Sequence, residues 1–194
     1  MVLTFKIDKT MQAIASLLHF HNTQEMSYLR LLKLLYIADR ESLKETGQPI
    51  TGDQLVAMEH GPVLSSVYNL IKGEHSAWGH WSRFFQKSGC RLKLILDPGN
   101  GKLSKYEIAK LREITRTYDE MNEWEMVNIV HEFPEWKRND PGKSAKPIPL
   151  EHLLEAIGRA GDLKAIVQDA RDQNAFDQLF ASVKGAEATV GASI

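Results

Sequence analysis

The sequence predicts an α+β fold that is mainly α, a helical domain with one small antiparallel β-sheet made of a hairpin and one short strand. Two observations support this prediction. Apolar residues recur at the helical period of about 3.6 residues through most of the chain. Leu92, Leu94 and Leu96 instead alternate with other residues just after the turn-forming pair Ser88-Gly89, as in a hairpin with one buried face. The 43% hydrophobic content of the 194 residues is enough for the core of one domain.

The most apolar helix is predicted from Tyr28 to Thr46, and we expect the rest of the fold to pack around it. Its apolar residues cover more than half of the helical circumference, so most of its sides should be buried. Ser27 is a suitable N-cap, and Gly47 can adopt the left-handed conformation that ends a helix. One narrower stripe, which we expect to face solvent, consists of Arg30, Lys33, Ile37, Arg40, Glu41 and Lys44.

Further elements flank this helix. An amphipathic helix is predicted over residues 8–22, with Asp8 as its N-cap. Residues 54–59 alternate weakly in polarity and predict the short strand. Pro62 fits the first position of the next helix, where its missing N–H is no loss, and Gly73 should end that helix.

Capping boxes mark two helices in the second half of the chain. Ser104 pairs with Glu107 in the first, and Asn122 with Glu125 in the second. Pro134 should stop the second of these helices, because a proline interrupts the helical hydrogen bonds. One more short helix is predicted to end at Gly158.

We predict three parts of the chain: a domain over residues 1–158, an amphipathic helical extension over residues 159–184, and a flexible tail over residues 185–194. The extension contains two segments with helical spacing. Their apolar residues are Leu163, Ile166, Val167 and Ala170 in the first, and Phe176, Leu179, Phe180 and Val183 in the second. An amphipathic helix buries its apolar face, so these residues should pack either on the domain or on a partner.

Composition excludes several classes of protein. The 24 basic and 25 acidic residues give a net charge of -1, which provides no global field for capturing nucleic acid or an anionic membrane. The single Cys90 allows no internal disulfide, as expected in a reducing cytoplasm. No apolar run reaches membrane-spanning length, and the N-terminus does not have the pattern of a signal peptide. We therefore expect a cytoplasmic protein with no membrane contact.

The histidines give no metal site. His19 and His21 are two positions apart on a predicted helix, so their side chains point about 200° away from each other and cannot share an ion. With one cysteine and no phosphate-binding loop, we expect neither a metal nor a cofactor.

Several motifs stand in a fixed order along the chain. The first are residues 31–40, 47–53 and 60–63, followed by Tyr68. The later ones are Trp81, Phe85, the strand at residues 92–96, Leu103, Ser104, Glu107, His131 and Trp136. Together they resemble the SocA-like or Panacea antitoxin domain, also described as the GepA phage-associated family. The resemblance covers about residues 7–158.

This resemblance implies an antitoxin of a bacterial or phage toxin-antitoxin system. Such a protein neutralises a co-encoded toxin by protein–protein binding, so its partner would be a cognate protein toxin. Neutralisation would proceed by direct masking or by delivery of the toxin to an ATP-dependent protease, in the manner of a proteolytic adaptor. The motif glycines and Pro62 have the character of turn and cap residues. The resemblance therefore implies a protein that is not an enzyme.

Two alternatives belong to other functional classes. A DNA-binding regulator of its own operon would use a basic stripe of Arg30, Lys33, Arg40 and Lys44, with further basic residues nearby in sequence: Lys137, Arg138, Lys143 and Lys146. Ile37 and Glu41 interrupt the stripe, as on an ordinary solvated helix face. A small enzyme would use residues drawn from Asp39, Glu59, His60 and His131, whose spacing does not require a shared site.

The sequence thus favours a protein-binding role. The candidate partner-binding residues are Arg40, Lys44, Phe176, Leu179, Phe180 and Val183.

Overall fold

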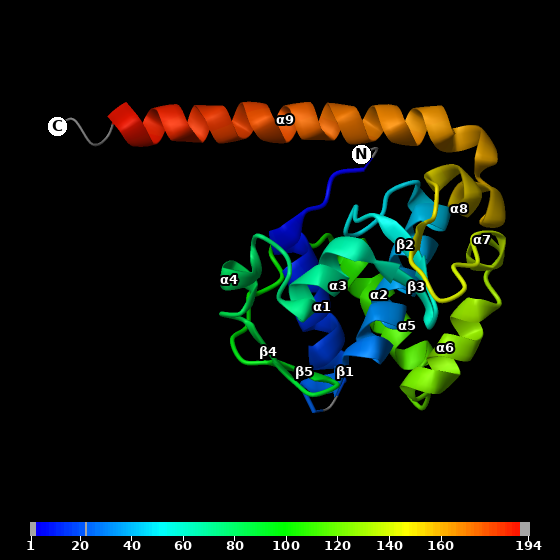
Figure 1. Ribbon diagram of the computed structural model, residues 1–194. Helices are drawn as coiled ribbons and strands as arrows, with labels where there is room; N and C mark the ends of the chain where they lie inside the picture. The colour runs from blue at the N-terminus through cyan, green and yellow to red at the C-terminus, as the bar shows by residue number, and fades with distance from the viewer. Residues whose placement is uncertain (1–2, 22, 191–194) are drawn as a thin grey trace.

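A computed structural model describes residues 3–21 and 23–190 of the protein, with side chains through residue 180. Its helices surround one central helix, and two small antiparallel sheets lie against them within the described residues (Figure 1). The predicted α+β, mainly α fold class is therefore confirmed. The single predicted sheet is two separate sheets.

The central helix α2 (Tyr28–Thr46) has the predicted bounds. It contacts α1, α5 and α6, and Leu31, Leu34 and Leu35 along it are fully buried. Gly47 ends it with φ at 77°, the left-handed conformation that residues with a Cβ rarely adopt. Ser27 is at the N-cap position, but its side chain makes no capping hydrogen bond.

Three helices surround α2: α1 (Ile7–Phe20), α5 (Lys105–Thr117) and α6 (Glu123–His131). Both predicted capping boxes are present, at the start of α5 and of α6. The predicted Asp8 cap is wrong, because α1 begins one residue earlier and Lys6 occupies its N-cap position. Helix α1 starts without a side-chain cap, and the segment before it is held by the bond from Lys6 N to Thr51 O at 3.1 Å.

The first sheet has the strand order β1-β5-β4, with β1 (Glu25–Ser27), β5 (Arg91–Leu94) and β4 (Phe85–Ser88). The predicted hairpin is β4–β5. Its turn is at Gly89 and Cys90, one residue later than predicted, and the short helix α4 (Trp78–Trp81) precedes it. Strand β1 was not predicted, because three residues are too few to show an alternating pattern.

The second sheet has the order β3-β2-β6, with β3 (Gly61–Leu64), β2 (Leu55–Met58) and β6 (Lys146–Pro147). Strand β2 matches the predicted short strand. The predicted helix start at Pro62 is wrong: Pro62 pairs with Ala57 in the sheet, and α3 (Ser65–Lys72) begins three residues later. The N-cap residue of α3, Leu64, makes no side-chain capping hydrogen bond. Ser66 N and Val67 N, in the first turn of the helix, donate to the Asp53 carboxylate, each at 3.0 Å.

The C-terminal part consists of α7 (Pro134–Arg138), α8 (Leu150–Ala156), a 3-10 turn (Ala160–Asp162) and α9 (Leu163–Val190). Pro134 follows the end of α6 as predicted, and it also begins α7. The two segments predicted after Gly161 form one continuous helix. Residues 185–190 of the predicted tail belong to α9, and residues 191–194 are outside the described residues. The division into three parts stays a prediction.

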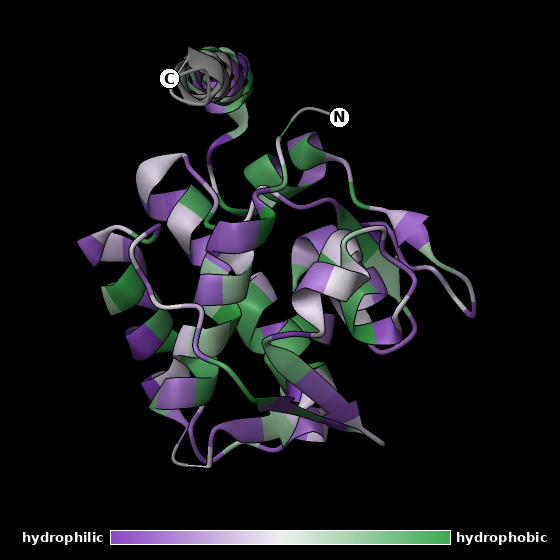
Figure 2. Ribbon diagram, turned by 90° about the vertical axis from the view of Figure 1, so that its left-hand side faces the viewer, coloured by the Kyte–Doolittle hydropathy of each residue, from purple (hydrophilic) through white to green (hydrophobic). Residues whose placement is uncertain are grey.

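Helix α9 lies across the end of the domain near the first N-terminal residues described (Figure 1). Figure 2 looks nearly along α9 and shows it outside the layers that the other elements form. Its first turns pack on a second, smaller core made of Leu43, Leu153, Leu154, Ile157 and Ile166. The main core is therefore complete without the rest of α9.

We predict that Leu35→Ala lowers the free energy of unfolding by about 2–5 kcal/mol, because it leaves a cavity at a fully buried position of α2. Chemical denaturation monitored by circular dichroism measures the change. Leu96→Ala is the control, since Leu96 is 52% exposed and its truncation should cost less than about 1 kcal/mol. Equal effects of the two substitutions would contradict the central position of Leu35.

Candidate partner-binding surfaces

The middle of α9 carries an exposed apolar surface, which we call the outer stripe: Phe176, Leu179 and Phe180. These side chains are 59%, 65% and 54% exposed. The two phenylalanine rings contact each other, with their centroids 4.6 Å apart. The fourth predicted residue of this segment, Val183, belongs to α9, but its side chain is outside the described residues.

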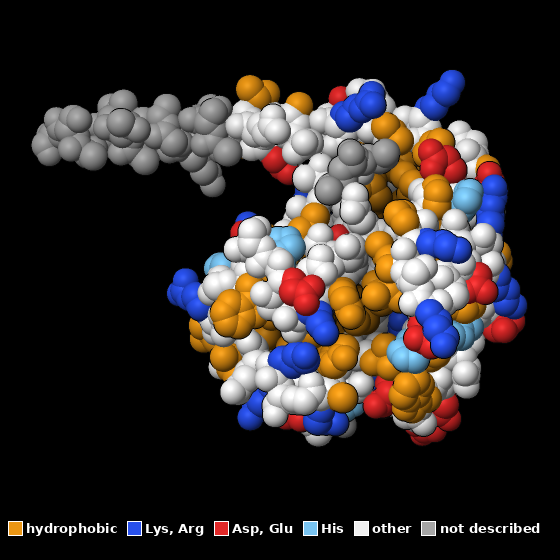
Figure 3. All heavy atoms as spheres, viewed as in Figure 1, with side chains coloured by type: hydrophobic (Ala, Val, Ile, Leu, Met, Phe, Trp, Pro, Cys, Tyr) orange, Lys and Arg blue, Asp and Glu red, His pale blue; other side chains and the backbone are white. Residues whose placement is uncertain are grey.

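The outer stripe faces away from the domain. Asp177 marks the side of α9 that faces the domain, because its carboxylate contacts Lys6 Nζ at 3.1 Å. At about 100° per residue, the three stripe residues lie roughly 60° to 160° around the helix from Asp177. In Figure 3, apolar side chains stand on the upper side of α9 and an acidic side chain on its lower side, toward the domain.

Weak contacts hold α9 to the domain beyond its first turns. The Lys6–Asp177 ion pair is solvent-exposed, with 35% and 57% of the two side chains accessible. Gln48 Nε2 reaches Asp169 Oδ2 only at 3.5 Å. Exposed ion pairs contribute about 0–1 kcal/mol, so the apolar contacts of Leu163 and Ile166 provide most of the attachment.

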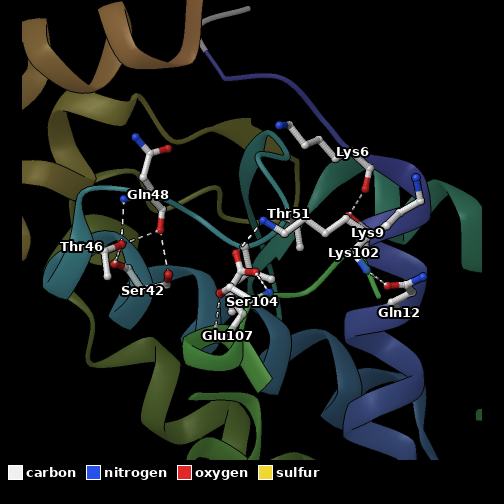
Figure 4. A network of polar contacts seen from close by, with 12 residues as sticks. Lys6, Lys9, Gln12, Ser42, Thr46, Gln48, Thr51, Lys102, Ser104 and Glu107 are labelled. Atoms are coloured by element: carbon white, nitrogen blue, oxygen red, sulfur yellow. Dashed lines mark hydrogen bonds and ion pairs between the residues drawn. The ribbon is translucent and has the colours of Figure 1, made fainter. Parts of the chain in front are cut away.

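A polar cleft of about 340 Å³ lies between α9 and the domain (Figure 4). Three lysines line this cleft: Lys6, Lys9 and Lys102. Each is paired with a carboxylate. Lys6 contacts Asp177, Lys9 contacts Glu107 at 2.5 Å, and Lys102 contacts Asp8 at 3.4 Å. The cleft is therefore not a strongly positive site for an anion.

Part of the floor of this cleft is an internal network. Gln48 O accepts hydrogen bonds from the hydroxyls of Ser42 at 2.7 Å and Thr46 at 3.2 Å, and Lys102 N donates to Gln12 Oε1 at 2.7 Å (Figure 4). These bonds fix the loop after α2 and the segment before α5. The polar groups serve the fold and position the surface over which α9 passes.

The predicted residues Arg40 and Lys44 lie in different environments. Arg40 donates from Nε to Glu135 Oε1 at 2.9 Å, its guanidinium lies 4.4 Å from the centre of the Phe133 ring, and its side chain is only 12% exposed. Lys44 is 52% exposed beside Glu41. Arg40 thus joins α2 to α7, whereas Lys44 is accessible to a partner.

The rest of the stripe predicted to face solvent is largely buried, which corrects that expectation. Arg30 is 5% exposed and donates to Tyr118 O and Asp119 O, both at 3.0 Å. Lys33 is 0% exposed and donates to Pro62 O at 2.9 Å. Long basic side chains at these positions bind backbone carbonyls of neighbouring elements, so neither can reach a phosphate.

Three of the four residues considered for an enzyme meet near the β2–β3 turn. Glu59 and His60 line a cavity of about 380 Å³ there, together with Lys33. The His131 ring lies beside Gly61, just after this turn, and stacks on Trp136, with ring centroids 4.0 Å apart. Asp39 lies elsewhere and accepts hydrogen bonds from Ile50 N and Thr51 N.

Burial governs the electrostatics of this turn. It lowers the pKa of the Lys33 amine to about 7, because no carboxylate offsets the loss of hydration. Burial, together with the nearby Lys33, also lowers the pKa of His131. His131 Nε2 is buried and has no hydrogen-bond partner among the described residues. A buried amine favours its neutral form, which suits a packed interior.

The described residues contain no group of three or more His, Cys, Asp or Glu side chains that could hold a metal ion. His19 contacts Asp97 at 3.1 Å, and His21 contacts Thr23 at 3.1 Å, so the two histidines have separate neighbours. Within the same residues, no helix combines the length and the apolar character needed to cross a membrane.

Comparison with known families identifies one match. A family model described as "Antitoxin SocA-like, Panacea domain" matches residues 31–137, which is more than half of the chain. The match begins in α2 and ends in α7, so it includes both sheets except β1 and β6. No curated protein and no solved structure matches significantly.

We predict that Arg40→Ala lowers the free energy of unfolding by roughly 3–5 kcal/mol, because it leaves the fully buried Glu135 carboxylate without its charged partner. Lys44→Ala is the matched control on the same helix and should change stability by less than about 0.5 kcal/mol. Urea denaturation of both variants measures the difference. A stable Arg40→Ala protein would contradict the importance of the Arg40–Glu135 pair.

We also predict that the stability difference between the wild type and Lys33→Met depends on pH. The pKa of Lys33 is about 7 in the fold and near 10.5 in the unfolded chain, so the unfolded state binds more protons between these values. Wild-type stability should therefore gain up to about 1.4 kcal/mol per pH unit from Lys33 as the pH rises from 7.

Lys33→Met removes this pH-dependent contribution to the free energy of unfolding. Denaturation curves of both proteins at pH 6, 7, 8 and 9 should show a constant difference below pH 7 and a change in favour of the wild type above it. A difference that stays flat to pH 9 would mean that Lys33 remains charged in the fold.

Proposed function

The chain belongs to the family of SocA-like antitoxins with a Panacea domain, and from this premise we propose that it neutralises a toxin encoded beside it by direct protein–protein binding. The observation that carries this proposal is the outer stripe, which is more than half exposed on a helix whose N-terminal turns are already anchored. We propose the stripe as the main contact for the toxin.

The chemistry of the outer stripe supports this role. Its residues have the i, i+3, i+4 spacing with which an amphipathic helix enters an apolar groove of a partner. Large aromatic side chains supply much of the binding energy at protein interfaces, and Phe176 and Phe180 together present such a surface. Their truncation should therefore weaken a complex far more than it weakens the fold.

The position of α9 also supports the proposal. The helix starts at Leu163, beyond the residues 31–137 that the family model matches. A surface outside the shared domain is free to vary between family members. Such variation would allow one antitoxin fold to serve different toxins.

The DNA-binding alternative receives no comparable support. Arg30 and Lys33, half of the basic stripe, are buried and bonded to backbone carbonyls. Arg40 is paired with Glu135. Of the stripe only Lys44 is half exposed. Lys137 and Arg138, nearby in sequence, are exposed, but each is paired with a glutamate, which offsets its charge toward a phosphate.

We predict that the double variant Phe176→Ser, Phe180→Ser folds normally but loses neutralisation. Both residues are exposed, so unfolding free energy should change by less than about 1 kcal/mol. The product of the adjacent gene is expressed from an inducible promoter, and survival is measured with each antitoxin variant. The control is Arg171→Ser, Gln178→Ser, which changes two exposed polar residues of the same helix and should protect cells fully.

The two parts of the proposal fail in different ways. If the wild type does not protect cells from the adjacent gene product and does not bind it in a pull-down, the antitoxin function is wrong for that pair. If the wild type protects and the phenylalanine variant protects equally, the function stands and the assignment to α9 is wrong. Protection in cells that lack ATP-dependent proteases supports masking, and its loss there supports delivery to a protease.

A further inference from the structure

Strand β4 is an exposed edge of the first sheet. The strand order β1-β5-β4 leaves one side of β4 without a neighbouring strand. Only its first residue, Phe85, is buried, while residues 86–88 are exposed. The other edge strand of this sheet, β1, has two of its three residues buried, and β3 of the second sheet is buried throughout. Strand β4 is thus more accessible than β1 and β3, and it is longer than the exposed edge strand β6, which has only two residues, one of them a proline.

The phase of the hairpin shows which backbone groups point outward. The two-residue turn at Gly89 and Cys90 makes Ser88 and Arg91 a hydrogen-bonded pair, and such pairs recur at every second residue. The bond from Ile95 N to Phe84 O, at 2.8 Å, agrees with this phase. The N–H and C=O groups of Phe85 and Lys87 therefore point away from β5, toward the free edge.

A hollow of about 470 Å³ borders this edge, between β4, α4 and the end of α3. We call it the edge hollow; its lining includes Ile71, Lys72, Trp78, Phe85, Lys87 and Ile95. Trp78 is 48% exposed and Ile95 50% exposed. In Figure 3, the region of α4 and β4 shows apolar side chains with lysine or arginine side chains next to them. The hollow offers an apolar surface beside unpaired strand groups.

The charged residues of the edge hollow are basic. Lys72 and Lys87 line it, and no Asp or Glu within the described residues does. The exposed Arg83 adds positive charge just before β4. The acidic residue nearest in sequence, Glu74, follows Gly73 but does not line the hollow. An occupant that complements this charge carries a carboxylate.

We propose that the edge of β4 binds an extended segment of another protein, which joins the sheet as an added strand. Its backbone pairs with Phe85 and Lys87, an apolar side chain enters the edge hollow, and an acidic residue two positions away lies beside Lys87. Alternate residues of a strand share one face, so both side chains can point to the same side. This inference goes beyond the proposed function, since it requires neither the toxin nor α9.

The charges argue against a second copy of this chain as the occupant. Two β4 strands paired about a two-fold axis would bring Lys72, Arg83 and Lys87 of both copies together. Like charges across a strand pair are destabilising, and lysines on edge strands oppose self-pairing. A segment with apolar and acidic residues avoids this repulsion.

The probe for the test is the fluorescein-labelled peptide Thr-Glu-Thr-Leu-Thr-Glu-Thr, with its ends blocked. A glutamate lies two residues from the leucine on either side, so the peptide can bind in either strand direction. Fluorescence anisotropy with the full chain should show saturable binding. A peptide with lysine in place of both glutamates should bind at least tenfold more weakly.

Backbone pairing is tested separately with N-methylated peptides. Methyl groups on the Leu and Glu nitrogens block one side of the strand, and methyl groups on the Thr nitrogens block the other. One of the two peptides should lose binding and the other should keep it, because only one side pairs with β4. Equal binding of both would overturn the proposal, and so would saturable binding that the lysine peptide matches.

Variants of the protein complete the test. Lys87→Pro removes the outward N–H of an edge strand, where proline is tolerated, and should weaken binding at least tenfold. Lys87→Gln is the control, which removes the charge but keeps the N–H and should weaken binding less than Lys87→Pro. Circular dichroism checks that both variants fold.

If Lys87→Pro does not fold, the N-methylated peptides alone decide the question. The absence of peptide binding at millimolar concentration would overturn the proposal. A wild-type dimer in sedimentation that Lys87→Pro converts to a monomer would also overturn it, because a second copy would then occupy the edge.

Discussion

The buried carboxylate of Asp39 holds the middle of the structure together. It is 4% exposed and accepts hydrogen bonds from Ile50 N and Thr51 N, both at 3.0 Å, and from the Thr51 hydroxyl. Burial raises the pKa of Asp39 to about 7, while these hydrogen bonds favour its charged form. The chain after α2 is thereby fixed to α2 itself. The Asp53 carboxylate accepts hydrogen bonds from Ser66 N and Val67 N in the first turn of α3. Asp39 and Asp53 therefore fix the start and the end of the segment that connects α2 to α3.

Helix α2 organises its surroundings through its polar residues as well as its leucines. Arg30 binds the chain after α5, Lys33 binds β3, and Arg40 pairs with Glu135 of α7. Each of these side chains reaches an acceptor on another element, because a buried polar end without a hydrogen-bond partner is costly. The two surfaces that we propose for binding, the outer stripe of α9 and the edge of β4, are both peripheral to this helix.

Local signals predicted the helical part of this fold well. The bounds of α2 follow from a continuous apolar pattern and from Gly47, and the starts of α5 and α6 follow from capping boxes that lie within four residues. The exposure of Phe176 and Phe180 could not be predicted in this way, since an amphipathic pattern is the same whether a helix packs on its own domain or on a partner. Their spacing indicated an apolar face, and the structure shows that the domain does not bury it.

The sequence by itself determined the bounds of α2 and the starts of α5 and α6, because the signals at these positions depend on neighbouring residues. Only the tertiary structure decided that Pro62 belongs to a strand, where it pairs with Ala57. The preceding residue of that strand, Gly61, packs so closely on α6 that a Cβ there would come within 2.5 Å of Val130 Cγ2. The same holds for the basic stripe of α2: charge pattern alone suggested a solvated face, yet Lys33 is buried. The carbonyl that satisfies its amine is brought there by β3, 29 residues away in the chain.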